Sequence, residues 1–183
     1  MASVAQWFSI PEGVYYHQGH SWVIPQGAEL VKVGVDDFAQ RLVGSTNKIS
    51  LPKVGARIEQ GDVGWKLGID SKTIDMLSPV TGDVVAVNKD IVKNPMLINE
   101  DPYGKGWLMM VKPDNQRATV KNLLTGKLAT VWMEKTADTL RERMGEELGV
   151  VYQDGGLPVS GIAKALSPDA WDKMASEFLL TQE

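Results

Sequence analysis

The chain has 183 residues, a length that suits one globular domain of ordinary size with a sizeable appendage. Hydrophobic residues make up 43% and charged residues 23% of it, which is typical of folded globular proteins and argues against a disordered or membrane-embedded chain. A formal net charge of -4 and a pI near 5.3 disfavour nucleic acid and anionic membranes as partners.

The sequence contains no cysteine, so it can form no disulfide, offers no thiol nucleophile and builds no cysteine-ligated metal site. Any redox-active sulfur chemistry would have to come from a cofactor. His17 and His20 are the only histidines, too few for a histidine-rich metal centre. We therefore expect no metal site.

The opening residues 1–13 lack both the basic segment and the long apolar segment of a secretory signal. No run in the chain approaches the roughly 20 apolar residues that cross a bilayer. These two observations predict a cytoplasmic protein.

Short β-branched runs separated by Gly, Pro, Asn and Asp fill residues 14–112, a pattern that predicts a small sandwich or barrel. A short helix is predicted at residues 36–42, where Asp36 can cap the start and Phe38 and Leu42 fall on one side. The predicted strands are residues 21–24, 29–35, 48–51, 63–69, 72–77, 82–87 and 107–111.

After Pro113 the apolar spacing becomes helical, which predicts one or two amphipathic helices over residues 119–148. Gly149 is predicted to end this helical region, and residues 155–158 to form a turn. Further helical pieces are expected from 160–166 and from Ser167-Pro168-Asp169, a strong helix-start signal. The apolar stripes comprise Leu124, Leu128, Val131, Trp132, Leu140, Met144 and Leu148, then Trp171, Met174 and Phe178.

Two stretches of the β-rich region echo each other, residues 51–58 with 61–62 and residues 78–85. Both run through Pro, Val and Gly into a β-branched strand. Between them, residues 69–73 (IDSKT) are polar enough for a tight turn that joins the flanking strands. Lys72 is therefore predicted at the tip of a hairpin between two similar half-units.

Several longer motifs keep a fixed order across this region. They are HSWV at 20–23, VGVDDFAQ at 33–40, LPKVG at 51–55, SPVTGDVVAVN at 78–88 and NPMLINEDPYGKGWL at 94–108. By these motifs the chain resembles the H-protein family of the glycine cleavage system. The resemblance implies a mainly β (α+β) fold: a lipoyl/biotinyl-type barrel-sandwich hybrid with a short helix insertion and a C-terminal helical extension.

The resemblance also implies an attachment lysine, which the family carries in the pattern E-S-V-K-A, eight positions ahead of the proline in S-P-x-S-G. Counting back from Pro79 arrives at Ser71, so Lys72 stands one residue late. The nearest carboxylate is Asp70, whereas the family has a glutamate three positions before its lysine. Because strand side chains alternate in direction, such a shift changes which side chains face outward.

We expect residues 14–132 to form the H-protein-like lipoyl domain and residues 133–183 the helical extension. The resemblance implies a carrier without a catalytic site, holding lipoate on Lys72 with Asp70 and Ser71 beside it, and shuttling an aminomethyl group between enzymes. The residues implied near the arm are His20, Asn99, Glu100, Asp101 and Tyr103. For His20, and for Trp132 and Trp171, structural packing roles are the favoured interpretation.

The partners that the resemblance implies are glycine decarboxylase, aminomethyltransferase, dihydrolipoyl dehydrogenase and a lipoate ligase or transferase, with self-association through the C-terminal helices as a further option. Two alternative functions stay open. One is an H-like lipoyl carrier for another pathway, such as sulfur or one-carbon metabolism. The other is an interaction module that carries no lipoate. A biotinyl carrier is disfavoured because the Met-Lys-Met setting is absent.

Overall fold

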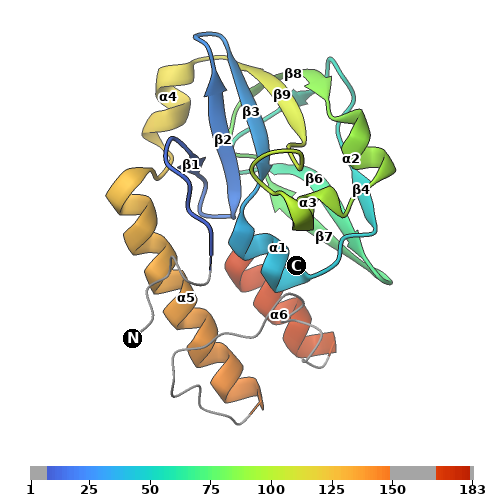
Figure 1. The fold of residues 1–183 in the computed structure, drawn as a ribbon, viewed down its shortest axis with the longest axis vertical. Helices are drawn as coiled ribbons and strands as arrows, with labels where there is room; N and C mark the ends of the chain where they lie inside the picture. Colours follow the sequence, from blue (N-terminus) through green and yellow to red (C-terminus); the bar gives the residue numbers. More distant parts are fainter. Residues whose placement is uncertain (1–7, 149–167, 182–183) are drawn as a thin grey trace.

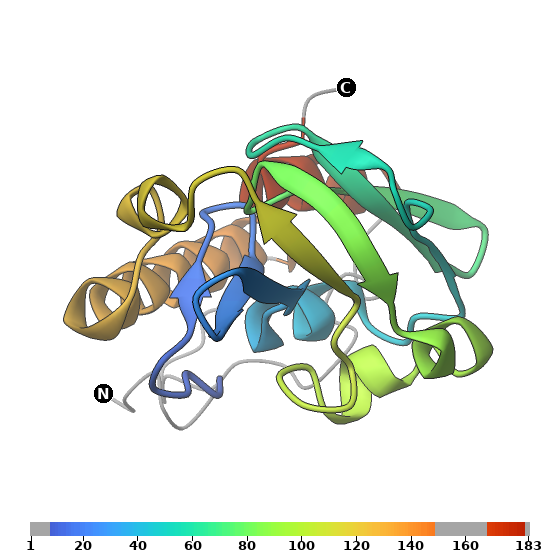
Figure 2. The same cartoon turned by 90° about the horizontal axis from the view of Figure 1, so that it is seen from above.

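The computed structural model describes residues 8–148 and 168–181. Two antiparallel sheets face each other over a hydrophobic core (Figures 1 and 2), and the helices of residues 37–43, 126–148 and 168–179 lie below the strands in Figure 1. The larger sheet has the strand order β1-β2-β3-β9-β8-β5 and the smaller one β4-β6-β7. The predicted mainly β sandwich with helices is therefore confirmed.

The strands of the larger sheet are β1 (Tyr15–Tyr16), β2 (Ser21–Gln26), β3 (Leu30–Val35), β9 (Met109–Pro113), β8 (Gly82–Val87) and β5 (Arg57–Ile58). Those of the smaller sheet are β4 (Lys48–Ser50), β6 (Val63–Ile69) and β7 (Lys72–Leu77). The bounds of β6, β7 and β8 are those that the sequence predicts.

The last strand begins later than predicted. Residue Trp107 belongs to the preceding loop, where its N–H donates to Gly104 O and its carbonyl accepts from the Asn88 side chain. The short strands β1 and β5 were not predicted, nor were the two small helices α2 (Lys89–Lys93) and α3 (Leu97–Glu100). Each is five residues or fewer, too short for a periodic pattern to develop.

Helix α1 (Asp37–Val43) confirms the predicted short helix, and Asp36 is its N-cap. One carboxylate oxygen of Asp36 accepts from Ala39 N at 2.8 Å. The region after β9 forms two helices, α4 (Gln116–Lys121) and α5 (Gly126–Leu148). Helix α6 (Pro168–Leu179) follows, beginning at the predicted proline. The predicted features at Gly149, at 155–158, at 160–166 and at Ser167 lie outside the described residues.

The predicted apolar stripe of α5 is partly wrong. Leu128 and Val131 are 69% and 61% exposed. Leu140 and Met144 are buried as predicted, and Ala129, Met133 and Ala137 complete the buried face. Small alanines and flexible methionines allow helices to approach closely. A stripe defined by large apolar side chains does not include the alanines.

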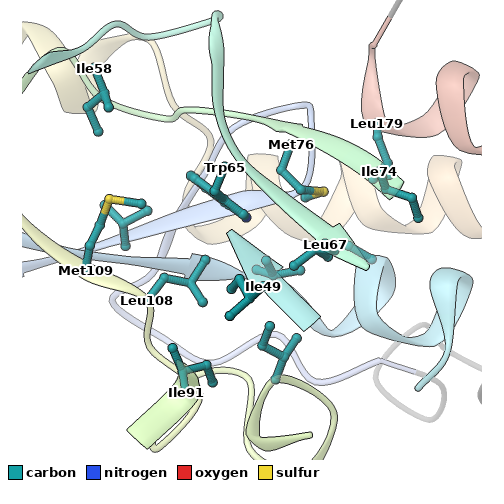
Figure 3. Close-up of a cluster of buried hydrophobic side chains, with 14 of the residues drawn as sticks. Ile49, Ile58, Trp65, Leu67, Ile74, Met76, Ile91, Leu108, Met109 and Leu179 are labelled. Atoms are coloured by element: carbon teal, nitrogen blue, oxygen red, sulfur yellow. The ribbon is translucent and has the colours of Figure 1, made fainter. Parts of the chain in front are cut away.

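Buried side chains form one cluster between the sheets, one among the helices and a smaller one of Val14, Tyr16, Trp22 and Ala129. Figure 3 shows the first, in which Trp65, Leu67 and Met76 of the smaller sheet face Leu108 and Met109. The second comprises Phe8, Phe38, Leu42, Met133, Ala137, Leu140, Met144, Met174 and Phe178. Helix α6 contributes to the first two clusters, because Trp171, Ala175 and Leu179 join the sandwich core. Within the described residues, no helix is long and apolar enough to cross a membrane.

Candidate functional site

The β6–β7 hairpin carries Lys72 at its tip. Ile69 and Lys72 form the last residue pair of the two strands, so the connecting loop is the two residues Asp70 and Ser71. Asp70 has φ 54, a left-handed conformation that aspartate tolerates better than most residues and that two-residue hairpin loops require. The predicted tight turn is confirmed, and Asp70 and Ser71 form it.

Strand register decides the side of the hairpin on which Lys72 lies. Residues opposite each other in an antiparallel pair project to the same side of the sheet. Lys72 is opposite the buried Ile69, and the next pair on that side is Leu67 with Ile74. Lys72 therefore projects from the core-facing side of the smaller sheet, where that side reaches its edge.

Helix α6 covers this edge and contacts the Lys72 side chain. Lys72 Nζ donates to Asp172 Oδ1 at 2.8 Å and lies 4.7 Å from the centroid of the Trp171 ring. The lysine side chain is 32% exposed. The primary amine thus reaches solvent at a hairpin tip, as covalent attachment of an acyl group requires, with a carboxylate and an aromatic face beside it.

A cavity of about 220 Å³ adjoins this contact between β7 and α6. Its lining includes Thr73 and Asp75 of the strand and Trp171, Asp172 and Ser176 of the helix. The residues that border Lys72 therefore come from two segments that lie far apart in the chain.

His20 is buried at the junction of the sandwich and the helices. Its Nδ1 lies 2.7 Å from Asp36 Oδ2, and its ring stacks between Phe38 and Trp132 at centroid distances of 4.4 and 4.7 Å. His20 also has φ 70, and its backbone is held by a bond from Asp36 N to His20 O. These contacts support a packing and orienting role for His20, and they give Trp132 a packing contact as well.

Two of the other residues implied near the arm, Asn99 and Tyr103, contact α1 or the residues that flank it. Asn99 donates to Gly44 O at the end of that helix and accepts from Thr46 N, whereas Tyr103 Oη accepts from Asp37 N in its first turn.

Asp101 accepts from Lys105 N within its own loop, and Glu100 is exposed. Burial raises the pKa of Tyr103 well above its ordinary value, and the nearby charge of Asp36 adds to the effect. The Tyr103 hydroxyl therefore stays protonated and serves as a hydrogen-bonding group.

The structure thus places the predicted residues in two groups. His20, Asn99 and Tyr103 bond to α1 or its capping residues, whereas Lys72 contacts α6. A second cavity, of about 310 Å³, is lined by His20 and Trp132 together with Glu177 and Phe178 of α6. Helix α6 therefore borders both the His20 cavity and the Lys72 contact.

The sequence did not identify Asp172 as a site residue, and it favoured packing as the role of Trp171. Trp171 does pack in the core, but its ring also lies under the lysine amine. Asp172 is 100 positions from Lys72 in the sequence. The sequence predicts helix α6 and its apolar stripe. It does not show which part of the protein the other residues of the helix contact.

The two facing sheets, with a lysine on the hairpin of the smaller sheet, define the lipoyl/biotinyl class of carrier domain. Residues 14–136 match the sequence model of the family described as glycine cleavage H-protein. The chain belongs to this family. Its members carry lipoate covalently on a lysine.

Individual relatives agree with this assignment. A glycine cleavage system H protein from Magnetococcus marinus is 36% identical over 140 residues, which cover 76% of this chain and 98% of the relative. Another, from Mycolicibacterium smegmatis, is 42% identical over 100 residues, covering 55% of this chain and 76% of the relative.

The crystal structure of a glycine cleavage system H protein from Mycobacterium marinum superimposes with a TM-score of 0.60 at 30% identity, covering 69% of this chain and 98% of the other. Helix α6 lies wholly beyond the residues that match the family model.

Proposed function

We propose that this protein is a lipoyl carrier that holds its cofactor on Lys72 and passes an aminomethyl group between the enzymes of glycine cleavage. Membership of the H-protein family supports the function. The single observation that supports the residue is the position of Lys72, next to the two-residue loop of the β6–β7 hairpin. When bound, the lipoyl group supplies a dithiolane whose sulfurs provide the redox and group-carrying chemistry.

The chain's own residues have the tasks of presenting and orienting the arm. A lysine offers a long, flexible stem and an amine that can form an amide, and a hairpin tip lets the stem move between partner active sites. The strands behind the tip are fixed by Ile74 and Met76, which are buried in the sandwich core. The proposed attachment point thus stands on a rigid support.

Lys66 is the matched control for this proposal. It lies on the outward side of the same hairpin, paired with Asp75 at 3.2 Å, and its side chain is 54% exposed. Exposure alone would favour Lys66 over Lys72. The proposal rests instead on the position of Lys72 at the tip of the hairpin.

Co-expression with a lipoate ligase followed by intact-mass measurement tests the assignment. We expect one lipoyl adduct on the wild-type chain and on Lys66→Arg, and none on Lys72→Arg. A lipoyl domain that the same ligase loads serves as the positive control. An adduct that persists in Lys72→Arg would overturn the residue, and an unmodified wild type beside a loaded control would overturn the function.

Glycine decarboxylase is the partner whose interaction follows most directly from the proposed function. The loaded protein should acquire isotope from methylene-labelled glycine when the decarboxylase is present, and the unloaded protein should not. We further propose that the chain itself supplies no catalytic group, that residues 14–132 form the carrier unit and that the protein acts in the cytoplasm.

A further inference from the structure

Lys72 stands one residue later than the lysine of the family pattern, and in this position it faces helix α6 of the C-terminal extension. In this register Lys72 shares its side of β7 with Ile74 and Met76, which point into the core. Lys66 and Asp75 lie opposite each other on the other side. Lys72 is therefore the lysine of the hairpin that faces α6.

Helix α6 is firmly anchored where it meets the lysine. Trp171 is 6% exposed and Leu179 is fully buried, both within the sandwich core. Leu179 lies beside Ile74 of β7 (Figure 3). On its other side α6 packs Met174 and Phe178 into the helical cluster. Two apolar contacts thus hold Asp172 and the Trp171 ring in place next to the hairpin.

Both contacts with the lysine depend on its positive charge. The Asp172 carboxylate forms an ion pair with the ammonium, and an aromatic face attracts a cation through its quadrupole. An acylated lysine is a neutral amide that can keep neither interaction. Acylation of Lys72 therefore has to break an ion pair and a cation–π contact that the folded chain provides.

We propose that Asp172 and Trp171 are positioning residues for the acceptor amine of Lys72, and that they hold it on α6 and slow its acylation. This inference rests on the proposed function for its biological meaning, because Lys72 must be the attachment site for the restraint to govern loading. The H-protein-like region supplies the lysine, and the extension beyond it supplies the restraint.

The chemical basis of the restraint can be measured with a small acylating reagent. In the reaction with sulfo-N-hydroxysuccinimide acetate, the lysine nitrogen forms a bond to the acetyl carbon and the ester C–O bond breaks. The hydroxysuccinimide leaves with the electron pair, and the amine proton passes to solvent. Peptide mass mapping at limiting reagent gives the separate rates for Lys72 and Lys66 in one sample of the full chain.

We expect Asp172→Asn to raise the Lys72 acetylation rate about two- to fivefold, the range of an exposed ion pair, and to leave Lys66 unchanged. Asp172→Glu should restore the slow rate because it returns the carboxylate. Asp169→Asn removes the same charge from an exposed position on α6 and should leave both rates unchanged. Trp171→Phe keeps an apolar anchor with a weaker cation–π partner, so it should raise the Lys72 rate less than Asp172→Asn.

Equal Lys72 rates in the wild type and in Asp172→Asn would overturn the restraint, provided that both unfold at the same temperature. A rise in Asp169→Asn as large as that in Asp172→Asn would overturn it too, because net charge would then explain the effect. The labelling experiment needs no ligase, so its failure is distinct from failure of the proposed function. A lipoyl adduct on Lys72 with unchanged labelling rates would leave the carrier function standing and remove the restraint.

Discussion

The sandwich and the helical layer of this protein bury their hydrophobic side chains by different means. In the sandwich, alternate residues of β6 and β7 face inward, and the pairs Trp65 with Met76 and Leu67 with Ile74 meet across the strands. In the helical layer, α5 presents small and flexible residues that accept Phe38 of α1 and Phe178 of α6. The first pattern follows strand periodicity, whereas the second depends on which helices meet.

Two features join these layers. Helix α6 gives Leu179 to the sandwich core and Phe178 to the helical cluster. His20 extends from the turn before β2 to stack on rings of α1 and α5. We therefore expect the helical layer and the sandwich to unfold as one cooperative unit.

The largest expected effect is that of Leu140→Ala in α5. Leu140 is fully buried in the helical cluster, so its truncation should lower the free energy of unfolding by about 2–5 kcal/mol. Leu67→Ala should cost a similar amount in the sandwich, and exposed Leu128→Ala should stay within about 0.5 kcal/mol of the wild type. Denaturant unfolding followed by circular dichroism should show one transition in each variant; a separate early transition in Leu140→Ala would show that the layers unfold independently.

Asp36→Ala should have the next largest effect, because it removes two contacts at the junction. The carboxylate caps α1 and bonds to buried His20 Nδ1, so we expect a loss of about 2–4 kcal/mol in the free energy of unfolding. Asp36→Asn keeps one acceptor oxygen, which can still cap α1 at Ala39 N, and puts an NH2 group in place of the oxygen that faces His20 Nδ1, so it should cost less than Asp36→Ala. Equal losses in the two variants, measured by denaturant unfolding, would mean that the charge rather than the hydrogen bonds matters.

Part of the motif region was predictable, where residues meet partners close in sequence, whereas the short helices α2 and α3 beside and within the motif 94–108 were not. The glycine of the VGVDDFAQ motif illustrates such a contact: a Cβ at Gly34 would lie 2.2 Å from Trp22 Cζ2, so the two motifs that contain these residues depend on each other. The hairpin with Lys72 at its tip followed from the turn residues 69–73 together with the flanking strands and the echo between the two half-units.

The contact between Lys72 and α6 could not be predicted in the same way. Spacing along the chain shows that Trp171 is on an apolar face, but not that this face packs against the β7 edge. The stripe on α5 was misplaced at Leu128 and Val131 for a related reason. Periodicity locates a helix, whereas the choice of buried face depends on a partner surface that is distant in sequence.

The free energy of unfolding should depend on pH because of Tyr103. Burial raises its pKa above the unfolded value of about 10, so the unfolded chain loses the phenolic proton first. The stability from the protonated hydroxyl is complete below about pH 10 and falls above it, by about 1.4 kcal/mol per pH unit for each such tyrosine.

Tyr103→Phe should make this alkaline decline shallower. Tyr16, whose pKa burial also raises, remains in that variant and accounts for the rest. At neutral pH the variant should lose about 0.5–1.5 kcal/mol, because Tyr103 Oη donates to Ser9 O and accepts from Asp37 N. Denaturant unfolding at neutral pH and above pH 10 measures both effects, and an unchanged alkaline slope would contradict the assignment.

The smallest expected effect concerns the outward side of the hairpin. Lys66 and Asp75 form an exposed pair on paired strands, so Asp75→Asn should change the free energy of unfolding by no more than about 0.5 kcal/mol, and less at high salt. Lys72→Gln removes the ion pair with Asp172 and also the cation–π contact with the Trp171 ring. It should therefore lower the free energy of unfolding somewhat more than Asp75→Asn does. If Asp75→Asn were the more costly variant, the ring contact would contribute little. The difference in the free energy of unfolding between the two variants would then reflect only the different exposure of the two lysines.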